Sequence, residues 1–142
     1  MKVSEIMTAP AVSVGVGESV EVAARTLAHY NIGALPVCDQ NGQVCGLVTD
    51  RDLVTRCIAA NRAPGKTTVK EIMTGQVTSV QPDMDAAVAA HLMGRLQVRR
   101  LPVVEKGKLC GIVSLGDMAI REESAMDAGD ALSDISSNIS VR

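Results

Sequence analysis

A hydroxyl residue followed three positions later by an aspartate occurs twice in this chain, each time directly after an apolar stretch. The first pair is Thr49 with Asp52, and the second is Ser114 with Asp117. Such a pair can start a helix, because the hydroxyl caps free N–H groups and the carboxylate favours the positive end of the helix dipole. It can equally hold a nucleotide, with the N–H groups and the hydroxyl facing a phosphate and the carboxylate accepting two ribose hydroxyls. The spacing alone leaves both interpretations open.

The two pairs belong to a sequence that is repeated almost completely. The second copy begins 66 residues after the first, and the offset falls to 65 only after a shortened turn. Each half alone is too small to bury its apolar surface well, so we expect the halves to pack together with pseudo-two-fold symmetry and to build a site where they meet. The matching segments are Val3–Thr8 with Val69–Thr74, Ala34–Val37 with Arg100–Val103, and Cys45–Thr49 with Cys110–Ser114.

Each copy is predicted to fold as strand, helix, strand, strand, helix, which gives a mixed α/β (α+β) protein. We assign residues 1–62 to the first repeat, 63–68 to a linker, 69–124 to the second repeat and 125–142 to a C-terminal tail that contains a short docking helix. The elements expected in the first copy are a strand at 12–14, a helix from Ser19, a hairpin of 35–38 with 44–48, and a helix from Asp50 to about Ala60. Those of the second copy are a strand at 77–80, a helix after Asp83, a hairpin of 101–104 with 109–113, and a helix from Leu115 to about Glu123.

The longer helix of each copy is amphipathic. Apolar residues recur at the helical spacing of three and four, and the face is more apolar than a small domain needs to expose. This pattern predicts that the module forms a homodimer. The predicted faces are Val20, Ala23, Ala24 and Leu27 in the first copy and Met84, Ala87, Val88 and Leu92 in the second.

The four cysteines lack the spacing of a zinc site. Asn41-Gly42 resembles a two-residue type I′ turn, which would place Cys38 opposite Cys45 across the first hairpin. Because reducing conditions disfavour a bond between them, free thiols are the favoured interpretation, and a disulfide or redox switch is the alternative.

The ordered motifs of each copy resemble the cystathionine β-synthase (CBS) domain, and the tandem pair resembles a Bateman module. The resemblance covers about residues 1–123 and rests on Glu-Ile-Met-Thr, Leu-Pro-Val, and a glycine followed by an apolar pair, a hydroxyl and the later aspartate. It implies a regulatory module with two pseudo-symmetric clefts between the copies, which typically bind AMP, ADP or ATP. It also implies helix pairs that meet a second module in a dimer.

The resemblance assigns roles to individual positions. It implies that Asp52 and Asp117 bind ribose hydroxyls and that Thr49 and Ser114 lie near phosphate. The residues expected to border the base or form the cleft wall are Pro36, Pro102, Val77, Thr78 and Ile112.

The copies differ in charge shortly before the Leu-Pro-Val motif. The second copy has Arg99 and Arg100 there, whereas the first has Gly33 and Ala34. Arginine suits phosphate because its planar fork gives two hydrogen bonds to one anion, although exposed charges on an edge strand also discourage aggregation. We expect the phosphate role, and hence a stronger anion site in the second copy.

Composition excludes several other classes of function. A net charge of -2, a pI near 5.6 and a single aromatic residue, Tyr30, argue against nucleic acid as the main partner. No apolar run has the roughly 18 residues of a membrane span, and no signal-peptide pattern opens the chain, so we expect a cytoplasmic protein. His29 and His91 stand at non-equivalent repeat positions without a nucleophile tied to either, so we expect no enzyme.

The sequence thus favours a module that senses adenosine nucleotides or energy state and signals to a separate regulated protein. No cofactor or metal is expected beyond the nucleotide ligand. The alternatives are an interaction or assembly module without ligand, and a module that binds another adenosyl ligand such as NAD or S-adenosylmethionine.

Overall fold

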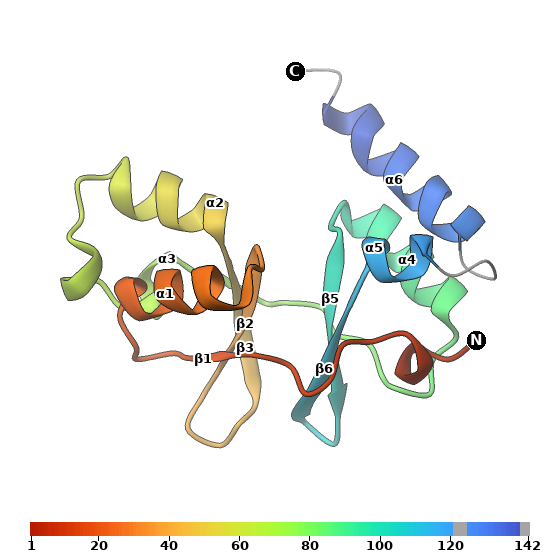
Figure 1. Cartoon of the computed structure of the whole chain (residues 1–142), viewed down its shortest axis with the longest axis horizontal. Coiled ribbons are helices and arrows are strands. Elements are labelled where there is room, and N and C mark those ends of the chain that lie inside the picture. Colours follow the sequence, from red (N-terminus) through yellow and green to blue (C-terminus); the bar gives the residue numbers. More distant parts are fainter. Residues whose placement is uncertain (121–124, 140–142) are drawn as a thin grey trace. The chain divides into compact units, whose positions relative to one another are not determined.

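The two compact units of the protein do not coincide with its two sequence repeats. The computed structural model describes residues 1–120 and 125–139. Unit 1 comprises Met1–Ala11 with Thr78–Arg142, and unit 2 comprises Val12–Val77. Each unit therefore combines the body of one repeat with the N-terminal segment of the other, as the red and green segments of Figure 1 show.

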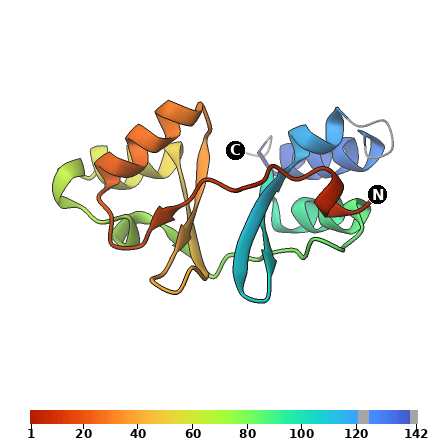
Figure 2. The same cartoon turned by 60° about the horizontal axis from the view of Figure 1, so that its bottom comes forward.

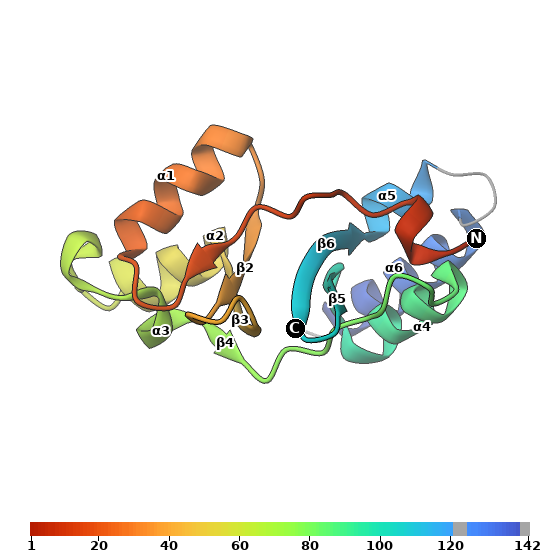
Figure 3. The same cartoon turned by 90° about the horizontal axis from the view of Figure 1, so that it is seen from below.

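Unit 2 is built on a four-stranded sheet in the order β1-β2-β3-β4 (Figure 3). β1 runs parallel to β2, and the other neighbours are antiparallel. Its strands are β1 (Val14–Gly15), β2 (Ala34–Cys38), β3 (Val44–Thr49) and β4 (Thr74–Gly75). Its helices are α1 (Val20–Tyr30), α2 (Asp50–Asp52), the π-helix η2 (Leu53–Ile58), the 3-10 helix η3 (Pro64–Lys66) and α3 (Val69–Ile72).

Unit 1 repeats this plan with shorter pairings at its two edges. The β5–β6 hairpin is flanked by an antiparallel bridge from Thr8 to Ile112 and a parallel bridge from Val80 to Val103. Figure 2 shows the N-terminal segment beside this hairpin. The elements are η1 (Val3–Glu5), α4 (Ala86–Leu96), β5 (Arg100–Glu105), β6 (Lys108–Ser114), α5 (Leu115–Ala119) and α6 (Ala125–Ile139). The mixed α+β class is thereby confirmed.

Two glycines allow the exchanged N-terminal segments to reach their sheets. A Cβ on Gly111 would lie 2.7 Å from Met7 Sδ and 2.9 Å from the Thr8 carbonyl oxygen. A Cβ on Gly46 would lie 2.5 Å from Met73 Sδ and 2.9 Å from the carbonyl oxygen of the following threonine. Only glycine permits this approach, so the repeated Cys-Gly of the sequence marks where the other repeat's segment docks.

The long helices begin and end at equivalent points of the repeat. Ser19 caps α1 and Asp85 caps α4, each accepting a hydrogen bond from a first-turn N–H group. Asn31 and Gln97 end the two helices in the left-handed conformation. The helix predicted after Asp83 therefore starts two residues later, because Asp85 and not Asp83 is the cap.

The predicted apolar helix faces need two corrections. In α1, Val20, Ala23 and Leu27 are buried in the core of unit 2, so they offer no surface to a second molecule and the argument for a dimer from this face is wrong. In α4 the predicted face is not the one that packs on the core, because Val88 is 53% exposed and Ala87 is exposed. The buried residues of α4 are Ala86, Ala89, Ala90, Met93 and Gly94.

The first hairpin has a different turn and register from those predicted. Gly42 N–H donates to the Asp39 carbonyl, and the Asp39 side chain accepts from the N–H groups of Asn41 and Gln43, which gives a three-residue loop in place of a two-residue turn. A bulge then places Cys38 opposite Val44. The predicted pairing of Cys38 with Cys45 is therefore wrong, and both thiols are free.

The second hairpin contains the two-residue turn. Lys106 and Gly107 both have positive φ, 53° and 79°, between the paired residues Glu105 and Lys108. This is the type I′ pattern, and it explains why this hairpin is one residue shorter than the first.

The segment predicted as a linker is ordered and forms part of unit 2. Thr67 is buried and its hydroxyl donates to the Ala63 carbonyl, while its own carbonyl accepts from Val20 N–H. The second helix of the first copy ends as the π-helix at Ile58, close to its predicted end. In the second copy α5 ends at Ala119, and the predicted end at Glu123 lies outside the described residues.

The C-terminal segment contains helix α6, which is longer than the short helix predicted there. Figure 1 shows α6 lying against α4 and α5. Its buried residues are Ala128, Ala131 and Ile135. A Cβ on Gly94 of α4 would approach Ala131 Cα to 3.3 Å, so the two helices pack closely there. Within residues 1–120 and 125–139, no helix combines the length and apolar character needed to cross a bilayer.

Candidate functional site

The second hydroxyl–aspartate pair sits at the junction of β6 and α5 in unit 1. Asp117 N–H donates to Ser114 Oγ at 3.1 Å, and Ser114 N–H donates to Asp117 Oδ2 at 3.1 Å. This reciprocal capping box fixes the first turn of α5. The helix-start interpretation of this pair is therefore correct, and a ligand would have to bind to a junction that is already rigid.

A pocket of about 400 Å³ opens beside this junction. Arg99, Arg100 and Ser114 form one side of it, and residues from Leu115 to Ala119 of α5 and from Ala125 to Leu132 of α6 form the rest. Arg100 pairs with Ser114 across the hairpin, and Leu115 N–H donates to the Arg99 carbonyl at 2.9 Å. Backbone pairing thus holds Arg100 to Ser114 and Arg99 to the residue that follows Ser114.

The two guanidinium groups at this pocket have no carboxylate partner within residues 1–120 and 125–139. Arg99 is exposed and Arg100 is half-buried. Two cations that have no carboxylate partner among the described residues can attract an anion here, since charge-assisted hydrogen bonds are roughly twice as strong as neutral ones. Chemically, the arrangement suits a phosphate group.

A second pair of facing residues on β5 and β6 lies two positions away from Arg100 and Ser114. Pro102 pairs with Ile112, and Ile112 exchanges backbone hydrogen bonds of 2.8 and 3.1 Å with Thr8. Residues two apart on a strand share a face and lie about 6.6 Å apart, so this row is on the face that carries Arg100 and Ser114. It has the reach expected between the base and the phosphate end of a bound nucleotide.

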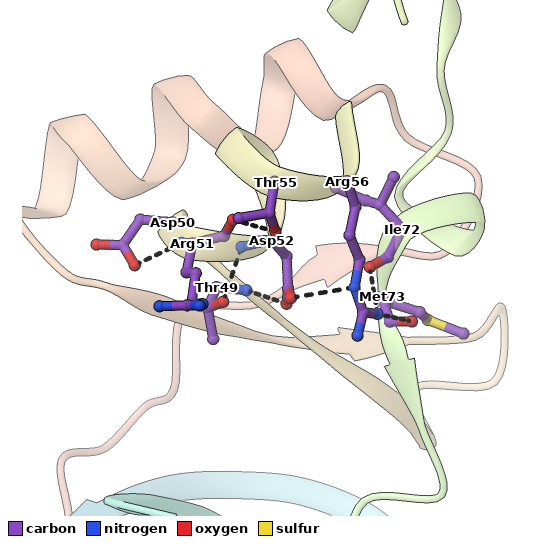
Figure 4. Close-up of polar contacts among 8 residues, drawn as sticks. All are labelled: Thr49, Asp50, Arg51, Asp52, Thr55, Arg56, Ile72 and Met73. Atoms are coloured by element: carbon purple, nitrogen blue, oxygen red, sulfur yellow. Dashed lines mark hydrogen bonds and ion pairs between the residues drawn. The ribbon is translucent and has the colours of Figure 1, made fainter. Parts of the chain in front are cut away.

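The first hydroxyl–aspartate pair forms the same capping box in unit 2 (Figure 4). Thr49 N–H donates to Asp52 Oδ2 at 2.9 Å, and Asp52 N–H donates to Thr49 Oγ1 at 3.1 Å. Arg56 Nε lies 3.7 Å from Asp52 Oδ1, and Arg56 Nη1 donates to the Ile72 carbonyl at 3.2 Å. Asp52 therefore also helps to fasten the exchanged segment that contains α3.

The backbone around this junction matches that of unit 1, but its side chains carry no positive charge before β2. Asp50 N–H donates to the Gly33 carbonyl at 3.0 Å, as Leu115 N–H does to Arg99 in unit 1. Gly33 and Ala34 supply no cation at the positions of the two arginines. The two junctions thus have closely similar backbones, and they differ in the two arginines that only the second copy carries.

The predicted site residues separate between the two units. Asp117, Ser114, Arg99, Arg100, Pro102, Ile112 and Thr78 belong to unit 1, whereas Asp52, Thr49, Pro36 and Val77 belong to unit 2. Of the unit 1 set, the pocket collects Arg99, Arg100 and Ser114. A cleft shared between the copies stays a prediction.

Sequence reasoning missed two contributors to the unit 1 site. Thr8 reaches Ile112 from the other repeat, and the repeated Met-Thr of the two N-terminal segments was the available signal. α6 supplies a whole wall of the pocket, from Ala125 to Leu132. That helix has no counterpart in the first copy, so the repeat carried no information about it.

The partly buried cysteines are unreactive in character. Burial is the main cause that raises the pKa of the Cys38, Cys45 and Cys110 thiols. Cys45 and Cys110 occupy equivalent bulges and donate to the carbonyls of Val37 and Val103. Within the described part of the chain, no three His, Cys, Asp or Glu side chains gather as a metal site would require.

Comparison with known proteins identifies both repeats. The model of the CBS domain family matches residues 3–58 and 69–122. The CBS domain-containing protein YhcV of Bacillus subtilis is 40% identical over 134 residues, which cover 94% of each chain.

Two solved structures share the fold at moderate identity. Hypoxic Response Protein I, with two coordinated zinc ions, is 33% identical with a TM-score of 0.78, and the match covers 84% of this chain and 97% of that one. The CBS domain pair of protein MJ0100, in complex with 5′-methylthioadenosine and S-adenosyl-L-methionine, is 29% identical with a TM-score of 0.75 and covers 84% and 93%.

Proposed function

The chain belongs to the CBS domain family, and from that premise we propose that it is a regulatory module that binds an adenosine nucleotide in unit 1 and signals to a separate protein. The nucleotide is AMP, ADP or ATP. The observation that carries this proposal is the convergence of Arg99, Arg100 and Ser114 on one pocket without a carboxylate to neutralise them among the described residues.

Each part of the nucleotide has a matching group in this site. The two guanidiniums and Ser114 Oγ take the phosphate next to the ribose. The Asp117 carboxylate accepts ribose hydroxyls while its Oδ2 keeps the capping bond, since a carboxylate has about four lone-pair positions. The row of Pro102 and Ile112 borders the base.

Known adenosyl binding in a relative supports the choice of ligand class. The solved MJ0100 domain pair contains 5′-methylthioadenosine and S-adenosyl-L-methionine, both of which carry an adenosine. S-adenosylmethionine bears a positive sulfonium where a nucleotide bears its phosphate. Two guanidiniums beside that point repel a cation and attract an anion, so this site favours the nucleotide.

Calorimetric titration of the whole protein with adenosine, AMP, ADP, ATP, NAD and S-adenosylmethionine tests the proposal. Wild type should bind AMP more tightly than adenosine, and Arg99→Ala/Arg100→Ala should lose about 2 to 3 kcal/mol for AMP and almost nothing for adenosine. The control Arg95→Ala/Lys106→Ala removes the same charge from exposed positions outside the pocket. Equal losses for AMP and adenosine in the arginine variant would count against phosphate recognition.

A second candidate, an assembly module, is favoured by exposed apolar side chains on two neighbouring helices of unit 2. Tyr30 of α1 is 53% exposed, and Val54 and Ile58 of η2 are 59% and 57% exposed. A homodimer that covers these side chains would remove them from water. A sedimentation mass near the 14.8 kDa monomer at micromolar concentration would contradict this dimer.

A further inference from the structure

The pocket proposed to bind the phosphate has a polar, positively charged part and an apolar part. Part of its lining is Arg99, Arg100 and Ser114, whereas another part belongs to α6 and consists of Ala125, Ala128, Gly129 and Leu132. None of these four side chains can donate a hydrogen bond to a phosphate oxygen. A phosphate that touches the α6 wall loses hydration without gaining a partner there.

The charge of α6 adds to this effect. Residues 125–139 include Asp127, Asp130 and Asp134 and contain no Lys, Arg or His. These carboxylates do not line the pocket, but a helix of net negative charge beside an anion site opposes each further negative charge that enters it. The arginine side therefore accepts one phosphate, and the helix side resists a second and a third.

The direction of the site leads a nucleotide toward this wall. The row of Pro102 and Ile112 lies two residues before the row of Arg100 and Ser114 along the same strand face, and the pocket at this second row is also lined by α5 and α6. A nucleotide with its base at the first row and its first phosphate at the second points any further phosphates at α6. We infer that α6 restricts this site to ligands with a single phosphate and that a triphosphate binds only when α6 leaves the pocket.

This inference rests on the proposed nucleotide site and adds its selectivity and its output. AMP and docked α6 are compatible, whereas ATP and docked α6 exclude each other. By thermodynamic linkage, ATP then favours undocked α6 to the same extent that docked α6 weakens ATP. Among the described side chains of α6 the buried ones are two alanines and Ile135, so its release exposes mainly small apolar groups.

Two variants loosen α6 without touching the pocket. A Cβ at Gly94 would lie 3.3 Å from Ala131 Cα and 3.1 Å from Asp134 Oδ2, so Gly94→Leu pushes α6 away. Ile135→Asp places a charge in its buried contact as an independent second variant. The matched control is Ala28→Leu, since Ala28 is the exposed residue at the same repeat position of α1.

The experiment measures the affinity of the full chain for AMP and ATP and follows hydrogen exchange in α6. Wild type and Ala28→Leu should bind AMP at least about tenfold more tightly than ATP, because the added phosphates meet an apolar lining that belongs to a negatively charged helix. In Gly94→Leu and Ile135→Asp the preference for AMP should fall below about threefold. A preference of about threefold corresponds to less than half of the free-energy difference of a tenfold preference. AMP should slow the exchange of α6 amides in wild type, and ATP should accelerate it.

Inorganic phosphate and tripolyphosphate, titrated in the same way, separate the inference from the proposed function. If nucleotides bind but the AMP preference is unchanged when α6 exchanges faster, the inference is overturned and the function stands. If no adenosine ligand binds but tripolyphosphate binds only to the loosened variants, the function is overturned and α6 selectivity stands. Failure of both anions to bind any variant overturns both.

Discussion

Units 1 and 2 have the same backbone plan but different surroundings at the same strand-to-helix junction. In unit 1 two arginines and a covering helix, α6, surround the junction. In unit 2 Gly33 and Ala34 replace the arginines, and α1 and η2 carry exposed Tyr30, Val54 and Ile58. Both units have the same glycine, capping box and hairpin. The difference between their candidate binding surfaces comes from a few side chains and from α6.

The largest effect we expect concerns what the units share. Gly111→Ala and Gly46→Ala each introduce a Cβ within 2.9 Å of a backbone carbonyl oxygen of the docked segment, which cannot move aside as a flexible side chain can. Each should lower the free energy of unfolding by about 2 to 3 kcal/mol, as overpacking typically does. Urea unfolding measures this loss. Gly17→Ala, with no atom within 4 Å of the new Cβ, is the control.

If the two glycine variants differ strongly in stability, the docking of the exchanged segments is not equivalent in the two units. A loss in Gly17→Ala as large as in the other two would instead attribute the effect to the loss of glycine itself.

The second prediction separates capping from ligand binding at the two aspartates. Asp117→Asn should lower the affinity for AMP by about 1.5 to 3 kcal/mol, the worth of hydrogen bonds to a charged group. It should cost below about 1 kcal/mol of stability, because the amide oxygen can still accept from Ser114 N–H and only the charge–dipole contribution is lost.

The matched variant Asp52→Asn should leave the affinity for AMP in unit 1 unchanged, since Asp52 belongs to unit 2. Calorimetry with both variants gives the comparison. Unchanged affinity in Asp117→Asn would remove this aspartate from the binding site and leave it as a helix cap.

The third prediction concerns salt. If the unit 1 site binds an anion through an exposed and a half-buried guanidinium, as proposed, the affinity for AMP should fall by about threefold to tenfold when ionic strength rises from 0.05 to 0.5 M, roughly as the Debye length shortens. The affinity for adenosine should stay constant. An identical salt dependence for both ligands would contradict a charge-selective unit 1.

The smallest effect is expected at the cysteines, where the units are alike. Burial raises the pKa of the Cys45 and Cys110 thiols, so both should react slowly with a thiolate-specific reagent at neutral pH. A raised pKa means that the folded state holds its protons longer than the unfolded chain. The associated stability is present below about pH 8.5 and is lost as pH rises through the folded value. Fast labelling of the native protein at pH 7 would contradict this.

Much of the local structure could be predicted from the sequence because it depends on neighbouring residues. The cap at Ser19, both hairpins and the α6 region follow from short-range patterns. The face of α4 was predicted wrongly because several registers fit its alanine-rich sequence. Adding the repeat offset to Val20, Ala23 and Leu27 gives Ala86, Ala89 and Met93, which are the buried residues.

The two-residue turn was assigned to the wrong hairpin because of a side chain two residues before the Asn-Gly dipeptide. Asn41-Gly42 has the composition of a type I′ turn, but the Asp39 carboxylate binds two N–H groups and favours the longer loop. Lys106-Gly107 has no such competitor at its start and forms the tight turn.

The charged part of the candidate site could be predicted because a comparison of the two sequence repeats shows where their residues differ in charge. Arg99, Arg100 and Ser114 were selected from the sequence, and the structure brings them to one pocket. The contributions of Thr8 and α6 could not be predicted, because both reach the hairpin from distant parts of the chain and no local pattern encodes a long-range partner.

The exchange of N-terminal segments has a consequence for how the chain is made. Unit 2 is one continuous stretch, Val12–Val77, so it can fold as soon as those residues have left the ribosome. Unit 1 joins Met1–Ala11 to residues from Thr78 onward, so its N-terminal segment must wait until the residues after Val77 have been synthesised. The unit that holds the arginine pocket therefore completes its fold after unit 2 can have formed.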